Sequence, residues 1–429
     1  MPVPAYVVRL AGCYEAFFRS WPSYWALPSC CYAGGVNALI LPVRGEIEGF
    51  TAASLGLLGT GWAVGYVAGC LRTPALVVKV GHIRAFGVMC ALAAISVLLS
   101  LLILSPWVWI PLRGISGFCF AGAAMIVESW LNERVDAPSR GRVFGIYTMV
   151  NLAASTAGQM VLTMGDPAGY LFFVLAAMTY CLALLPTALS ATASPSALVS
   201  VSLDLRALWR NSPVAVFAVL MVGVSNGSFG ALAPVYASRV GLSLSDVALF
   251  ASVPILAGAA AQIPVGYLSD RNDRRMVLIG VACLGLLADL LFIALMPGGV
   301  GANIAIVAVF GASVFSMYPL IVAHANDHAA PGSFIQVSGG LLLVYGLGAI
   351  GGPTVAGFAM TNFGNTSLFW TTGCGHVLLI LFAILRMRTR AGVAHADKQA
   401  FRASPMARAS TPETAALDAR AEQAPGTDS

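Results

Sequence analysis

Four ionisable residues stand inside segments that are otherwise almost entirely apolar: Arg113, Glu128, Asp289 and His376. Placing a charge in apolar surroundings costs free energy, so such residues usually serve a function or pair with one another. A guanidinium can hold an anionic group, and a carboxyl in such surroundings can bind and release a proton. These four residues are therefore the first candidates for chemistry in the chain.

Arg113 and Glu128 fall on one predicted helix. Their separation corresponds to about 22 Å along the axis and about 60° around it, so both line much the same face at different depths. One interpretation is that Arg113 holds an anionic group or a carboxylate while Glu128 exchanges a proton. The other is that Glu128 belongs to a structural charge cluster with Arg134, Arg140 and Arg142.

Neutral polar side chains in other apolar segments could hydrogen-bond a solute: Asn37, Asn151, Gln159, Ser225, Asn226, Ser228, Gln262, Tyr318 and Tyr345. Most such residues instead join helices to one another, each contributing about 0.6 kcal/mol. Asn37, Asn226 and Gln262 are selected as candidates for solute binding.

The composition excludes a soluble protein as the scaffold for these residues. Of the 429 residues, 58% are hydrophobic and only 10% are Asp, Glu, Lys or Arg, whereas a soluble domain carries about 25%. The net charge of +5 is spread over short loops and forms no basic stripe that would bind nucleic acid. Nine cysteines without C-x-x-C spacing argue against a disulfide framework or a zinc module. What remains is a polytopic membrane protein.

Two histidines have the spacing of metal ligands, because His324 and His328 could share one face of a helix. The sequence offers no third strong ligand nearby. The prediction is therefore that the chain holds no metal and no cofactor.

Twelve segments of roughly 20 apolar residues are long enough to cross a bilayer as helices. They cover residues 23–43, 53–76, 86–104, 107–130, 143–164, 169–189, 213–236, 245–267, 277–296, 303–322, 334–360 and 366–385. We predict an all-α membrane protein with two pseudo-symmetric six-helix bundles, at 23–189 and 213–388. An interfacial segment at 1–22 precedes them, and a linker at 190–212 joins them. The polar residues 389–429 predict a disordered tail.

Basic residues indicate the orientation, because they stay on the cytoplasmic side of a membrane. With both termini inside, the termini and cytoplasmic loops hold 19 of the 23 Lys and Arg residues. The opposite side has only Arg44 and Arg239. Both termini are therefore predicted to be cytoplasmic.

The two halves of the sequence repeat one another. A shift of 192 residues places Gly49 on Gly241 and Thr51 on Ser243. Each hydroxyl residue lies two residues before a predicted span, where it can cap the helix. Two parallel six-helix repeats are typical of a transporter whose site lies between its halves.

Two motifs carry a resemblance to a known family. The loop at 266–275 reads GYLSDRNDRR, and its alternating carboxylates and guanidiniums can satisfy one another at headgroup level. The sequence RGISG at 113–117 is followed by RGR at 140–142. These stretches resemble the G-x-L-x-D-R-x-G-R-R and R-x-x-Q-G signatures of the major facilitator superfamily. Asp273 and Ser116 stand where that family has Gly and Gln.

The resemblance implies a cytoplasmic gate made of charged residues from both halves: Lys79, Arg84, Glu133, Arg140, Arg142, Asp270, Arg271, Arg274, Arg275 and Asp327. Asp327 matches Glu133 in the repeat and is expected to pair with Arg271 or Arg274. The resemblance also makes the helices of Asp289 and His376 neighbours, so that these two residues could form an intramembrane pair. The alternative to a functional pair is a structural one that hides two polar groups from lipid.

The predicted function is secondary active transport of a small solute by alternating access. Because no nucleotide-binding motif is present, we expect an ion gradient to drive transport, and we select protons as the coupling ion. The alternative is a membrane sensor or receptor that binds a ligand on the same scaffold without moving it. An enzyme is disfavoured, since no nucleophile or metal constellation occurs. The 21 Arg against 2 Lys are typical of a GC-rich bacterial genome, so we expect the protein in a bacterial inner membrane. We also expect it to be a monomer.

Overall fold

The computed structural model describes residues 5–134, 140–188, 198, 204–330, 333–389, 398, 401, 407 and 410–416. Of residues 5–24, 134, 140–142 and 416 only the backbone is described. Within this part of the chain every regular element is a helix.

Each half of the chain forms a bundle of six long helices. The first bundle contains α1 (Ala5–Ile47), α2 (Ala52–Val80), α3 (His82–Leu102), α4 (Pro106–Arg134), α5 (Arg140–Met160) and α6 (Leu171–Ala188), with a 3₁₀ helix η2 (Val161–Met164) after α5. The second contains α8 (Pro213–Arg239), α9 (Leu244–Arg271), α10 (Arg274–Leu295), α11 (Val300–Asn326), α12 (Phe334–Phe363) and α13 (Ser367–Met387). Two short helices are α7 (Leu205–Asn211) in the linker and α14 (Pro412–Ala416) in the tail. Each predicted span thus corresponds to one long helix.

Among the described residues, eleven of these helices are long and apolar enough to cross a membrane. The twelfth, α5, is less apolar because it carries residues such as Asn151 and Ser155, which line a cavity between the bundles. Large apolar side chains on the outside of the bundles, such as Leu92, Ile95 and Leu287, are exposed where lipid would cover them. The chain is therefore an integral, multi-pass membrane protein.

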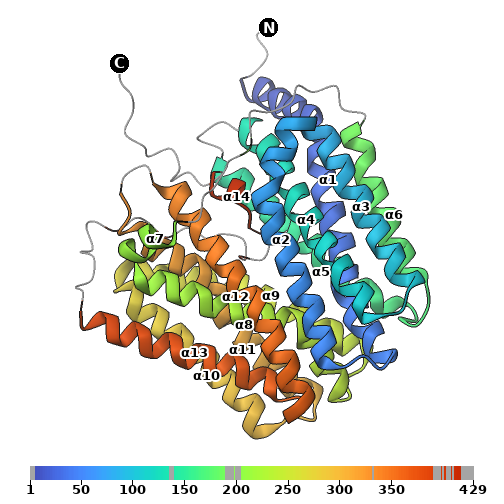
Figure 1. Cartoon of the computed structure of the whole chain (residues 1–429). Coiled ribbons are helices and arrows are strands. Elements are labelled where there is room, and N and C mark those ends of the chain that lie inside the picture. The colour runs from blue at the N-terminus through green and yellow to red at the C-terminus, as the bar shows by residue number, and fades with distance from the viewer. Residues whose placement is uncertain are drawn as a thin grey trace.

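The two bundles pack in the same way. Helix α1 contacts α5 and α6, just as α8 contacts α12 and α13. Likewise α2 contacts α4 as α9 contacts α11, and α3 contacts α6 as α10 contacts α13. Figure 1 shows the bundles side by side, with α2 of the first next to α8 and α12 of the second. The predicted pseudo-symmetry is therefore present in the helix contacts.

The repeated turns also match in detail. Gly49 and Gly241 both have a positive φ, 75° and 85°, which glycine adopts without strain. The hydroxyl of Thr51 accepts a hydrogen bond from the backbone of Ser54 at 3.2 Å, and that of Ser243 accepts one from Asp246 at 3.3 Å. These are the caps predicted from the sequence repeat, and they begin α2 and α9.

Helix α2 touches its neighbours backbone to backbone. A Cβ atom on Gly65 would lie 1.8 Å from the carbonyl oxygen of Gly114 on α4. Across the bundles, a Cβ on Gly56 would lie 2.3 Å from the carbonyl oxygen of Pro353 on α12. Glycine is required at both points, because any larger residue would push the helices apart.

We call the face that carries the loop 269–275 the basic face, because the predicted cytoplasmic loops reach it, and the other the opposite face. Near the basic face, residues 410–416 lie against α4 and α12 and are mostly buried. The composition predicts disorder for the whole tail, so these residues depart from that prediction. From 390 onward, the rest of the tail lies outside the described residues except for Lys398, Phe401 and Ala407.

Candidate functional site

A cavity of about 200 Å³ lies between the two bundles. Its walls come from α1, α2, α4, α5 and α6 of the first bundle and from α8, α9 and α12 of the second. Four of the predicted pathway residues line it: Asn37, Arg113, Asn226 and Gln262. The cavity is therefore where we expect a solute to bind.

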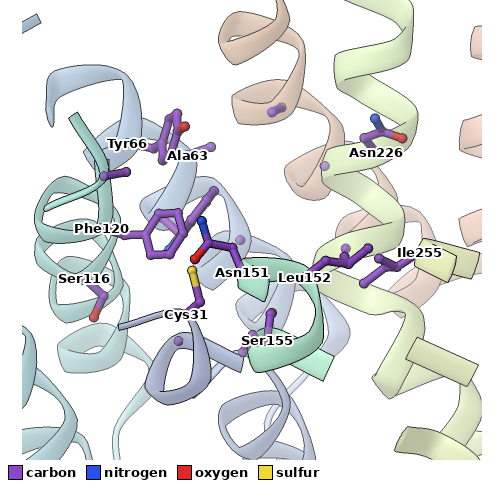
Figure 2. Close-up of a pocket in the computed structure, with 18 of the residues that line it drawn as sticks. Cys31, Ala63, Tyr66, Ser116, Phe120, Asn151, Leu152, Ser155, Asn226 and Ile255 are labelled. Atoms are coloured by element: carbon purple, nitrogen blue, oxygen red, sulfur yellow. The ribbon is translucent and has the colours of Figure 1, made fainter. Parts of the chain in front are cut away.

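One wall of the cavity is aromatic. Trp62 and Tyr66, one turn apart on α2, stack with ring centroids 5.1 Å apart, and Phe120 of α4 lies 6.1 Å from Trp62. Figure 2 shows Tyr66 and Phe120 on the first-bundle side of the pocket. This wall was not predicted, because aromatic residues in an apolar helix usually belong to the core. The spacing of four residues between Trp62 and Tyr66 is the only sequence signal for it.

Three buried amide oxygens in the cavity are free to accept hydrogen bonds. Those of Asn37, Asn151 and Asn226 have no partner among the described residues. A buried acceptor without a partner costs about 1–3 kcal/mol. Asn37 and Asn151 belong to the first bundle and Asn226 to the second, and Figure 2 shows Asn151 and Asn226 on different walls. A solute with hydrogen-bond donors could therefore contact both bundles at once.

Arg113 and Glu128 share α4 but lie in different surroundings. Arg113 lines the cavity, whereas Glu128 is only 1% exposed and lies toward the basic face. The hydroxyl of Tyr147 donates to Oε1 of Glu128 at 3.0 Å. The hydroxyls of Thr411 and Thr414, both from the tail, donate to Oε2, the second at 2.9 Å. The tail contacts could not be predicted from the sequence.

The cavity is closed toward the opposite face by contacts between the bundles. Arg239 of α8 donates three hydrogen bonds to the carboxylate of Glu46 on α1, at 2.8 to 3.1 Å. The hydroxyl of Ser252 on α9 donates to the side-chain oxygen of Gln159 on α5 at 2.9 Å. The ion pair was not predicted, although Arg239 is one of only two basic residues expected on that side. We call these four residues the opposite-face contacts.

Further inside, α2 and α12 also meet through hydroxyls. The hydroxyls of Thr60 and Thr354 lie 2.7 Å apart, and Thr60 donates to the carbonyl of Ile350 at 2.8 Å. These bonds lie near the contact of Gly56 with Pro353. The seam between α2 and α12 is thus built from small residues and hydroxyls.

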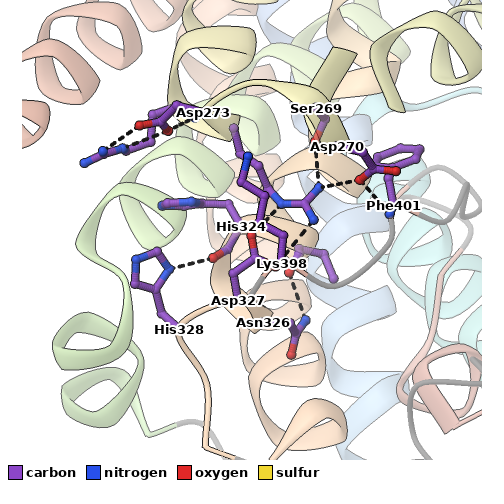
Figure 3. A network of polar contacts seen from close by, with 12 residues as sticks. Ser269, Asp270, Asp273, His324, Asn326, Asp327, His328, Lys398 and Phe401 are labelled. Carbon is purple, nitrogen blue, oxygen red and sulfur yellow. Dashed lines mark hydrogen bonds and ion pairs between the residues drawn. The ribbon is translucent and has the colours of Figure 1, made fainter. Parts of the chain in front are cut away.

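At the basic face, Arg274 bonds to several residues of a buried polar network, and Figure 3 shows Ser269, Asp270 and Asp327 of this network. Nε of Arg274 donates to Oδ2 of Asp327 at 2.6 Å, and both side chains are 1% exposed. It also donates to Ser269 at 2.6 Å and lies 3.5 Å from Asp270. Asp327 was expected to pair with Arg271 or Arg274, and in the structure it pairs with Arg274.

The other predicted gate residues lie nearby but in different roles. Arg271 places its guanidinium 3.8 Å from the ring centre of Tyr267, and Arg275 bonds to Asp273 at 2.7 Å. Lys79, Arg84 and Glu133 are exposed at the same face. The side chains of Arg140 and Arg142, together with Arg134 of the alternative charge cluster, lie outside the described residues.

Asp273 lies between α9 and α10, outside the spanning helices. Burial raises the pKa of its carboxyl, but hydrogen bonds from the Arg275 side chain and backbone outweigh that effect and hold the pKa below its usual value. The carboxylate is therefore ionised, and it caps the start of α10.

Asp289 of α10 and His376 of α13 lie together in the second bundle. Nδ1 of His376 lies 2.7 Å from Oδ2 of Asp289, and both side chains are fully buried. Thr372 donates to the other oxygen of Asp289 at 2.6 Å. Neither residue lines the central cavity. This geometry favours the structural interpretation of the pair.

Comparison with known families decides the class of protein. The model of the Major Facilitator Superfamily matches residues 29–339. The chain belongs to the major facilitator superfamily. It is 26% identical over 342 residues to an uncharacterized MFS-type transporter of Yersinia enterocolitica, covering 77% of this chain and 86% of that protein. An uncharacterized MFS-type transporter of Enterobacter sp. (strain 638) is 27% identical over 344 residues, covering 78% and 86%.

Solved structures of this superfamily share the fold. The nucleoside transporter NupG superposes with a TM-score of 0.69 at 15% identity, covering 86% of this chain and 98% of that one. A bacterial homolog of the human lysosomal transporter Spinster, in an inward-facing and occupied conformation, gives 0.67 at 16% identity, covering 89% and 98%. The predicted superfamily and fold are thus confirmed, and the chain is a membrane transporter for small molecules rather than an enzyme.

Proposed function

We propose that this transporter moves a small solute with a planar ring and hydrogen-bond donors, coupled to protons. The observation that carries the proposal is the pairing of an aromatic wall with buried amide acceptors in one cavity. Trp62 and Tyr66 offer a surface on which a planar ring stacks. Asn37 and Asn226 offer oxygens that lack a partner among the described residues.

Arg113 adds a positive charge to the same cavity. We propose that it binds an anionic or strongly electron-rich group of the solute. Because a planar guanidinium forms directional hydrogen bonds, it would also orient the solute between the two bundles.

Proton coupling is assigned to Glu128. In the described part of the chain, the carboxyl of Glu128 is hydrogen-bonded by three hydroxyls, those of Tyr147, Thr411 and Thr414. A hydroxyl can donate to a carboxylate or accept from a carboxylic acid, so this site accommodates either protonation state. A guanidinium in direct contact would have favoured the charged state only.

The state of the structure supports alternating access. The opposite-face contacts hold the bundles together on one side of the cavity, while at the basic face the tail lies between α4 and α12. With the basic face in the cytoplasm, as the distribution of Lys and Arg predicts, this is an inward-facing arrangement. We place the protein in a bacterial inner membrane as a monomer, with both termini inside.

The proposal is tested with purified protein in proteoliposomes. A thermal-shift screen of nucleobases, nucleosides and aromatic carboxylates identifies a ligand. Accumulation of that ligand is then measured with and without an imposed pH gradient. The gradient should drive accumulation in the wild type, and Glu128→Gln should abolish that response at an unchanged amount of inserted protein. Binding without any flux would instead support a receptor, and gradient-driven flux in the variant would exclude Glu128 as the proton site.

A further inference from the structure

The C-terminal tail reaches into the space between the bundles at the basic face. Residues 410–416, the last five of which form α14, contact α4 of the first bundle and α12 of the second. Thr411 and Glu413 are only 1% and 2% exposed, although both are polar. Figure 1 shows α14 between the two bundles. A polar segment is buried at this depth only where its polar groups find partners.

Those partners belong to the proposed transport site. Thr411 and Thr414 donate to Oε2 of Glu128, and the hydroxyl of Tyr66 donates to the backbone carbonyl of Ser410. Oε1 of Glu128 is bonded to Tyr147 of the cavity wall. Among the described residues, the hydrogen bonds to Oε2 thus come from the tail.

The tail is also bound on its way to the cavity, by the loop that carries the superfamily motif (Figure 3). Nζ of Lys398 donates to the carbonyl of Asn272 at 2.5 Å, and the backbone of Phe401 donates to Oδ1 of Asp270 at 2.9 Å. The ring of Phe401 lies so close to Gly266 that a Cβ there would be 2.2 Å from it. The loop therefore directs the tail toward the space between the bundles.

The segment does not completely fill the space next to it. A crevice of about 40 Å³ remains between residues 410–415 and the side chains of Tyr318, Phe334 and Leu342. The segment belongs to the same chain as α13, which ends at Met387, so its binding at the cavity is intramolecular. Binding of this kind is reversible and needs only weak intrinsic affinity.

We infer that residues 410–416 are an intramolecular plug of the cavity. The plug occupies the basic-face entrance, covers Glu128 and excludes solute from that side until it leaves. Its effect on transport rests on the proposed function, whereas its occupancy of the entrance does not.

The test uses Cys31, which lines the cavity. The full chain in lipid nanodiscs is treated with N-ethylmaleimide, and modification of each cysteine is followed by mass spectrometry. Thr411→Ala/Thr414→Ala removes both hydrogen bonds to Oε2 and should speed modification of Cys31 about tenfold. A chain ending at residue 409 should show at least the same increase. A cysteine introduced at Asn362 (Asn362→Cys), which is exposed near the end of α12, provides the reference in every chain and should react at one rate in all of them.

Two matched variants separate the plug from general loosening of the fold. Thr411→Ser/Thr414→Ser keeps both hydroxyls and should leave Cys31 as protected as in the wild type. Thr389→Ala removes a hydroxyl that donates locally, to the carbonyl of Arg386, and should leave the Cys31 rate unchanged. Equal Cys31 rates in the wild type, the double alanine variant and the shortened chain would overturn the inference. Because cysteine modification requires no substrate, these rates decide between plugged and open entrances even if transport is never detected.

Discussion

The bundles bind each other at the opposite face, where Glu46 of α1 pairs with Arg239 of α8. At the basic face the pair of Arg274 with Asp327 joins α10 to the end of α11, inside the second bundle. The two ion pairs also differ in how deeply they are buried. Arg239 and Glu46 are 25% and 16% exposed, whereas Arg274 and Asp327 are each 1% exposed. Under the proposed alternating access, the contact that opens is partly exposed to water, whereas the contact that holds one bundle together is buried.

Breaking the buried pair of Arg274 with Asp327 should have the largest effect, and this effect is on stability. Asp327→Ala leaves the Arg274 guanidinium buried without its main counter-charge, which costs about 3–5 kcal/mol of stability. The matched control is Asp270→Ala, because Asp270 is 40% exposed and 3.5 Å from Arg274; it should cost below about 1 kcal/mol. Thermal unfolding of purified protein measures both. Equal losses would show that burial does not distinguish these two carboxylates.

Breaking the more exposed pair of Glu46 with Arg239 should change how the two bundles are arranged and leave the stability of each bundle unchanged. Glu46→Ala or Arg239→Ala should favour opening at the opposite face by about 1–2 kcal/mol, or roughly 5- to 30-fold. Ala38→Cys, at a cavity-lining position, reports this opening through its labelling by a membrane-impermeant thiol reagent from that side. The charge exchange Glu46→Arg/Arg239→Glu should restore protection. Labelling that stays slow in both single variants would rule out a gating role for the pair.

The neutral contact at the same face should contribute less. Gln159→Ala removes the acceptor of the Ser252 hydroxyl, a hydrogen bond worth about 1 kcal/mol. We expect about a fivefold rise in Ala38→Cys labelling. Combined with Glu46→Ala, the effects should add, because both bonds break in the same opening. A wild-type rate in the single variant would mean that the ion pair alone closes this face.

The smallest effect is expected for pH at the basic face. Since Asp273 has a pKa below its usual value, it contributes stability above the pKa of the unfolded chain, and this is lost as the pH falls through the folded pKa. The side chain is 29% exposed, so the contribution should stay below about 1 kcal/mol. Thermal unfolding between pH 3 and 6 should show a slightly steeper loss of stability in the wild type than in Asp273→Asn. Parallel curves would contradict this.

The fold was predictable because it depends on local patterns. Runs of apolar residues placed each span, and the repeat of Gly49 and Thr51 as Gly241 and Ser243 placed the turns and caps. Asn37, Arg113, Asn226 and Gln262 could be chosen because polar groups are rare in such helices, and they line the cavity.

The remaining features depend on contacts between distant parts of the chain. The bond of Glu46 to Arg239 requires knowing that the ends of α1 and α8 meet. Thr411 and Thr414 lie in a polar stretch of the sequence, which predicts exposure to water, but both are buried. Their hydrogen bonds to Glu128 of α4 explain this burial. The composition of a segment indicates whether it folds in water, but it does not reveal hydrogen-bond partners on a helix far away in the sequence.

The contact of Gly56 with Pro353 has a mechanical consequence. At this point α2 and α12 meet through backbone atoms, and the nearby Thr60 and Thr354 are small. Interlocked large side chains would have to leave and re-enter their pockets for the bundles to rotate. Under the proposed alternating access, two smooth surfaces would let the bundles slide at this seam, and a single added methyl group at position 56 would wedge it.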